Sequence, residues 1–135
     1  VVPILQGHDI PILIDSAGDI TAAVPWFKES GIGGILPLER QAGVDVVALR
    51  EAHPDMRWLG CYDKMVMTEG EDAMRAEFER LLPVAAGGGL VISVDHQTPP
   101  GVPLENYEIY VQLFREYAEK AGELARENLS GPGHE

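Results

Sequence analysis

The sequence predicts an α/β fold built on a parallel sheet, and two observations support this. Short apolar runs alternate along the chain with amphipathic stretches of helical period. Four of the apolar runs also end in an acidic residue beside a polar or cationic one: Asp15-Ser16, Glu39-Arg40, Asp63-Lys64 and Asp95-His96. A strand, a polar residue at its carboxyl end and then a helix make the repeating unit of parallel α/β proteins. Ligands bind at the carboxyl ends of such strands, so the four pairs predict one reactive rim and an enzyme.

The first two units follow from apolar runs and from proline and glycine positions. We expect a strand at residues 11–15 with a helix from about 20 to 30, then a strand at 33–39 with a helix from about 44 to 52. Pro25 lies inside the first of these helices and should kink or restart it, because proline removes a helical hydrogen bond.

The third and fourth units complete the predicted sheet. A strand at residues 56–62 precedes a helix that should begin at the capping-box spacing Thr68-Glu69-Gly70-Glu71 and end at Pro83. The fourth strand is expected at 90–94. A proline-rich loop follows it, and then the longest helix, from about 104 to 127.

Length and composition limit the class of protein. The chain of 135 residues suffices for one domain, expected at 1–129, and residues 130–135 have the composition of a flexible tail. The net charge of −12 argues against a nucleic-acid partner. No apolar run approaches the roughly 20 residues of a membrane span, which argues against a membrane partner. A single cysteine, Cys61, fits a reducing compartment, so we expect a cytoplasmic protein.

Four βα units are half of a TIM (β/α)8 barrel, which needs about 250 residues. A parallel sheet of only four strands would leave two apolar edges unpaired. We therefore predict a half-barrel that corresponds to the carboxyl-terminal portion of a longer parent. We also predict that two copies form a homodimer that completes a barrel by pairing these edges.

A family resemblance enters at the last strand and loop, Asp95-His96-Gln97-Thr98-Pro99-Pro100-Gly101-Val102-Pro103-Leu104-Glu105-Asn106-Tyr107. This segment resembles the carboxyl-terminal segment of the uroporphyrinogen decarboxylase superfamily. Residues 11–20 and the Gly-X-X-Asp strand end in residues 59–64 agree with it in order and spacing. The resemblance covers about residues 11–121. It implies a TIM-barrel enzyme that either decarboxylates the acetate arms of uroporphyrinogen or transfers methyl groups with corrinoid proteins and thiols.

The resemblance also suggests site residues. It places the family's histidine on His96 and its strand-end acid on Asp63, which we expect to be catalytic. Asp95 next to His96 could raise the pKa of the imidazole and hold its tautomer for general acid catalysis. The residues expected to bind substrate are the remaining polar residues of the four strand ends: Asp15, Ser16, Glu39, Arg40, Lys64 and Asp95. These charges could instead pair around the rim and only stabilise it.

No metal ligand is expected. The zinc-dependent methyltransferases of the superfamily use a His-X-Cys pair, and the matching strand here contains Ile14-Asp15-Ser16. Asp15, Cys61 and His96 would be a chemically legitimate zinc set, but no spacing motif supports it. Cys61 as a small buried strand residue is the simpler interpretation.

The expected function is therefore that of a carboxy-lyase without cofactor, acting on a tetrapyrrole in porphyrin biosynthesis. The alternative is a corrinoid-dependent methyltransferase of the same superfamily, with a methyl donor as its small-molecule partner. A second alternative is a non-catalytic half-barrel that assembles with itself or with a partner. The arginine-rich segment that binds tetrapyrrole carboxylates in the decarboxylases is absent from this sequence, so the chain alone is expected to have little activity.

Overall fold

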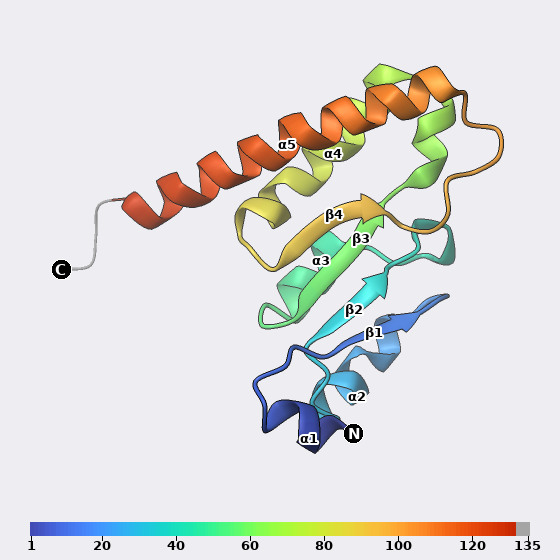
Figure 1. The fold of residues 1–135 in the computed structure, drawn as a ribbon. Helices are drawn as coiled ribbons and strands as arrows, with labels where there is room; N and C mark the ends of the chain where they lie inside the picture. Colours follow the sequence, from blue (N-terminus) through green and yellow to red (C-terminus); the bar gives the residue numbers. More distant parts are fainter. Residues whose placement is uncertain (132–135) are drawn as a thin grey trace.

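A computed structural model describes residues 1–131, which form a single sheet with helices between its strands (Figure 1). The strands are β1 (Leu13–Ser16), β2 (Gly34–Pro37), β3 (Arg57–Tyr62) and β4 (Leu90–Val94). The α-helices are α1 (Val2–Gln6), α2 (Val24–Glu29), α3 (Val46–Ala52), α4 (Glu71–Ala86) and α5 (Leu104–Ser130). Short 3-10 helices lie at η1 (Thr21–Ala23), η2 (Arg40–Ala42) and η3 (Lys64–Thr68).

The sheet is parallel throughout, and its spatial order β1-β2-β3-β4 is the order of the chain. The longest pairing joins β3 to β4, from Trp58 opposite Leu90 to Tyr62 opposite Val94. Helices α2, α3 and α4 lie behind the strands in Figure 1. Connections of one hand place the helices of such a sheet on one face. The predicted α/β class is confirmed, and the arrangement is consistent with half of a βα barrel.

The core fills the space between the sheet and its helices. Trp58 and Tyr62 from β3 are fully buried there, together with Phe78 of α4 and Tyr117 of α5. The rings of Phe78 and Tyr117 are stacked with their centroids 5.1 Å apart, and the rings of Tyr62 and Phe78 are 4.5 Å apart. Burying each such side chain contributes about 1.5–3 kcal/mol, so this aromatic cluster fixes α4 and α5 against the sheet.

Several predicted boundaries hold and others need correction. The helix expected at 20–30 is divided, since η1 ends before Pro25, which lies in the first turn of α2. The restart at this proline is therefore confirmed. The capping box is wrong: Thr68 ends η3, its hydroxyl donates to the Met65 carbonyl at 2.9 Å, and α4 begins after Gly70 without a side-chain cap.

Pro83 does not end α4, which continues to Ala86. The last turn buries Val84 and Ala86, and this apolar contact offsets the hydrogen bond that the proline removes. The sequence also gave no indication of α1. At the other end, α5 extends through Ser130, which was expected in the tail, and residues 132–135 of that tail lie outside the described residues. Within residues 1–131, no helix is both long enough and apolar enough to cross a membrane.

Candidate functional site

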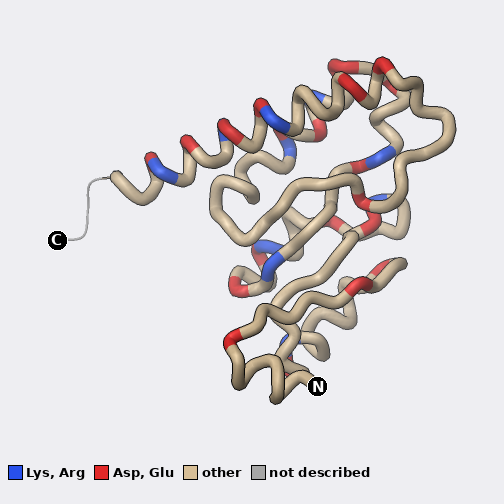
Figure 2. The backbone as a smooth tube through the Cα atoms, in the orientation of Figure 1, with Lys and Arg blue, Asp and Glu red and all other residues tan. Residues whose placement is uncertain are grey.

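The carboxyl ends of β2, β3 and β4 bring charged and amide side chains together, and Figure 2 shows acidic and basic residues gathered there. The parallel direction of the strands causes this, because all of their carboxyl ends meet at one edge. We call the group the rim cluster. Its members are Glu39, Gln41, Asp63, Lys64 and Asp95.

Asp95 lies at the centre of the rim cluster with a fully buried carboxylate. Its Oδ2 atom accepts the backbone N–H of Arg40 at 2.7 Å, and its Oδ1 atom accepts the backbone N–H of Lys64 at 3.2 Å. The Lys64 ammonium lies 3.4 Å from the same Oδ1 atom. A buried carboxylate needs such charged and N–H partners to offset its lost hydration. The Asp95 side chain, which follows β4, therefore holds the loops that follow β2 and β3 in place.

Lys64 is surrounded by oxygen atoms. Its Nζ atom lies 3.1 Å from Glu39 Oε1, 3.4 Å from Asp95 Oδ1, and within hydrogen-bond distance of Gln41 Oε1. An ammonium group has three donors, so each of them has an acceptor here. The side chain is only 12% exposed. Lys64 and Glu39 therefore form an ion pair across the rim, and whether either side chain also binds substrate stays a prediction.

Asp63, expected to be catalytic, is half-buried, and its hydrogen bonds join the start of η3 to neighbouring elements. Its Oδ1 atom accepts the backbone N–H of Met65 at 2.9 Å, which caps η3, and the Gln41 amide at 2.7 Å. Its own N–H donates to Glu77 Oε1 at 3.0 Å. Asp63 is therefore held by contacts from two other elements.

Glu77 is a buried acid of this region that the sequence analysis missed. Arg80 binds it with two hydrogen bonds, Nε to Oε2 at 2.8 Å and NH2 to Oε1 at 2.7 Å, and Arg80 also reaches Asp45 Oδ1 at 3.1 Å. The paired Glu77 carboxylate raises the pKa of the Arg80 guanidinium. A signal was available, because Glu77 lies between Met74 and Phe78 on the apolar stripe of α4, where an acid requires a buried partner.

His96 follows the rim cluster with an exposed side chain. Among the described residues, no hydrogen bond of its imidazole ring is found, and both Asp95 oxygens are directed to Arg40 and Lys64. The expected support of His96 by Asp95 is therefore wrong. Both residues lie in a bend after the end of β4, and the Asp95 carboxylate is turned toward the loops after β2 and β3.

The side chains of three other expected residues lie apart from the rim cluster. Asp15 is exposed and Ser16 half-buried at the end of β1, the edge strand of the sheet. The Arg40 guanidinium donates to the Val44 carbonyl at 3.0 Å and lies 3.6 Å from Asp45, at the start of α3. Of the residues expected to bind substrate, only Glu39, Lys64 and Asp95 bring their side chains together.

Cys61 is buried at 1% exposure, and its burial raises the pKa of the thiol. Within residues 1–131, no three histidine, cysteine or acidic side chains are grouped as a metal site, and Asp15, Cys61 and His96 do not assemble into one.

Chemically, the rim combines a buried ion-pair network with the exposed His96 side chain. The network positions loops, and an imidazole is a side chain commonly used for general acid–base catalysis. A scan against models of known protein families gives no match to this chain, and a search of curated proteins gives none either.

Proposed function

We propose that this chain forms the carboxyl-terminal part of a decarboxylase-like lyase acting on a tetrapyrrole carboxylate. The observation that carries the proposal is the exposed His96 imidazole at the carboxyl end of β4, beside loops held by the buried Asp95 carboxylate. The resemblance of residues 95–107 to the uroporphyrinogen decarboxylase superfamily supports the same residue. Ligand sites of parallel α/β folds lie at this end of the strands.

The proposed role of His96 is proton delivery. When an acetate arm loses CO₂, the bond between its methylene carbon and its carboxyl carbon breaks. The electron pair stays on the methylene carbon, which must then take a proton. An imidazolium is a common general acid, and it can donate such a proton. Lys64 would support the loops rather than bind the leaving carboxylate, because its three donors are occupied.

The test uses the parent protein of which we propose this chain is the carboxyl-terminal portion. Incubation with uroporphyrinogen should release CO₂ and give products with fewer carboxylates. His96→Ala should lower the rate by about 10²–10⁴-fold, the range for loss of a general acid–base group. Gln97→Ala is the matched control, because Gln97 is the exposed next residue. An equal rate for wild type and His96→Ala would remove His96 from the mechanism.

The same assay separates the alternatives. A parent that changes the visible spectrum of a methylated corrinoid, and leaves porphyrinogens intact, would be a corrinoid-dependent methyltransferase. A parent that does neither would favour the non-catalytic half-barrel.

A further inference from the structure

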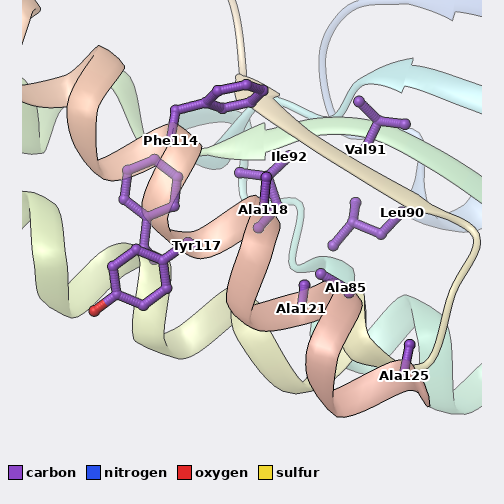
Figure 3. A pocket seen from close by; sticks show the side chains of 11 residues that line it. Ala85, Leu90, Val91, Ile92, Phe114, Tyr117, Ala118, Ala121 and Ala125 are labelled. Atoms are coloured by element: carbon purple, nitrogen blue, oxygen red, sulfur yellow. The ribbon is translucent and has the colours of Figure 1, made fainter.

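The segment between β4 and α5 reverses the direction of the chain at the rim, because α5 returns along β4 (Figure 1). Side chains of both elements line the groove between them, among them Ile92 of β4 and Ala118 of α5 (Figure 3). The segment carries His96, the proposed proton donor, just after the end of β4. The contacts that hold this segment therefore decide where His96 lies.

Both ends of the segment are hydrogen-bonded to the same short helix, η3. At its start, the Asp95 carboxylate accepts the backbone N–H of Lys64, the first residue of η3, at 3.2 Å. At its end, the Asn106 side chain in the first turn of α5 donates from Nδ2 to the Met67 carbonyl of η3 at 2.7 Å. Three residues of a 3-10 helix span about 6 Å, so residues 96–105 leave and return over a short distance. Compact loops with such closely spaced ends are Ω-loops, which often carry functional residues.

Between these two anchors the segment has few contacts of its own. Among the described residues, Val102 has the only backbone N–H of residues 96–103 that donates within the protein, to the Pro99 carbonyl at 3.1 Å. Val102 also packs against the core, whereas His96 is exposed. Proline fixes the φ angle at three positions of the segment, which stiffens it. A stiff segment that is held at both ends leaves His96 fewer directions than one held only at Asp95.

The chemistry of Asn106 matches the contact with η3 better than it matches the start of a helix. Asn106 is half-buried in the first turn of α5, where the helix dipole favours an aspartate. An ionised aspartate has no donor for the Met67 carbonyl, whereas an amide has two. The amide at this position is therefore explained by the hydrogen bond to η3.

We propose that Asn106 is a positioning residue for the proposed proton transfer. Its hydrogen bond to η3 closes the segment and thereby limits the directions open to the His96 side chain. This role rests on the proposed function, because Asn106 acts in that reaction only through His96.

Amide hydrogen exchange on this chain, measured by NMR, tests the anchor without reference to activity. Asn106→Asp keeps the size of the side chain and Asn106→Ala shortens it, and both remove the donor. The Val102 N–H should then exchange at least tenfold faster, because its turn with Pro99 opens when the segment is released, while the amides of β3 keep their wild-type rates. Glu105→Gln is the matched control, since residue 105 is exposed in the same turn and should leave the Val102 rate unchanged. Equal Val102 rates in wild type and either Asn106 variant would overturn the anchor.

Kinetics of the parent test the role in catalysis. Asn106→Ala should lower kcat about 10–10²-fold and change KM less than about twofold, because a proton donor displaced by about 1 Å loses rate without loss of substrate binding. In a His96→Ala background the same change should lower kcat less than about twofold, because the group that Asn106 positions is absent. A loss by the same factor in both backgrounds would show that Asn106 only stabilises the fold, and would overturn the proposal.

The two experiments separate failure of this role from failure of the proposed function. A parent that leaves porphyrinogens intact overturns both the lyase and the role of Asn106 in it, while the exchange rates still decide whether Asn106 anchors the segment. A parent whose rate falls in His96→Ala and stays at the wild-type value in Asn106→Ala retains the lyase and overturns the role of Asn106 alone.

Discussion

Asp95 is the residue on which the loops of the rim depend most. Its buried carboxylate accepts hydrogen bonds from two backbone N–H groups and lies beside the Lys64 ammonium. We expect Asp95→Asn to lower the free energy of unfolding by about 3 kcal/mol, because it removes one of the two carboxylates paired with the Lys64 ammonium and breaks charge-assisted hydrogen bonds to two backbone N–H groups. Urea unfolding measures this. Asp15→Asn, at an exposed position, should change stability by less than about 0.5 kcal/mol, and an equal loss in both variants would contradict the assigned role of Asp95.

Two buried tyrosine hydroxyls and one buried thiol, which can lose a proton at high pH, predict a loss of stability at alkaline pH. Burial raises the pKa of Tyr110 to about 12 and raises the pKa values of Tyr62 and Cys61 further, from ordinary values of 10.0 and 9.0. Above about pH 9 the unfolded chain therefore loses protons that the folded chain keeps, and the free energy of unfolding falls as pH rises. Denaturation at several pH values should show a smaller fall for Tyr110→Phe. Tyr107→Phe is the control, since Tyr107 is 43% exposed, and an equal effect of both variants would contradict the explanation.

At the scale of secondary structure elements, the approach of β3 to β2 depends on Gly60. Its φ angle is 110°, and an added Cβ atom would lie 2.0 Å from the Pro37 carbonyl oxygen. Both the backbone conformation and the clash disfavour a side chain, so Gly60→Ala should cost about 2–4 kcal/mol. Gly101→Ala is the control, because nothing lies within 4 Å of a Cβ atom there. Thermal unfolding of the two variants should separate clearly, and similar melting temperatures would show that β2 shifts to accommodate the methyl group.

The elements that the sequence predicted well are those with local signals. Apolar runs placed all of the strands, and Pro25 placed the start of α2, because proline acts directly on the backbone. The elements that were mispredicted depend on tertiary contacts. Pro83 stays within α4 because the turn after it is buried, and the capping-box residues are overridden by the packing of η3. Local propensity cannot report such contacts.

For the candidate site too, the sequence predicted what depends on local signals and strand direction, and missed what depends on tertiary contacts. Strand direction alone predicted that Glu39, Lys64 and Asp95 share one rim. It could not predict which of them pair, because the loops after the strands decide where each side chain points. For this reason Asp95 faces Lys64 rather than His96, and the Arg40 guanidinium faces Val44 and Asp45.

For the whole molecule, charge opposes the association that the apolar edges favour. Each chain carries a net charge of −12, so two copies repel each other at long range. If two copies associate as the sequence predicts, the dimer should tighten when NaCl rises from about 0.05 to 0.5 M, because salt screens this repulsion while apolar contacts persist. Sedimentation equilibrium at the two salt concentrations measures the dissociation constant. A dimer that weakens with salt would show that ion pairs, and not apolar contacts between the sheet edges, hold the copies together.

The sequential order of the sheet has a consequence for how the chain acquires its structure. Each strand pairs with the strand next along the chain, so no pairing has to wait for a distant segment. The loops closed by successive pairings are of similar, modest length, which keeps the entropic cost of each one small. During synthesis, β1 and β2 can pair while β4 is still being made, and each later unit adds to an existing edge. Of the elements within residues 1–131, α5 emerges after all the strands, and its aromatic contacts with α4 then complete the core. We therefore expect the sheet to form by the addition of successive strands, from β1 to β4.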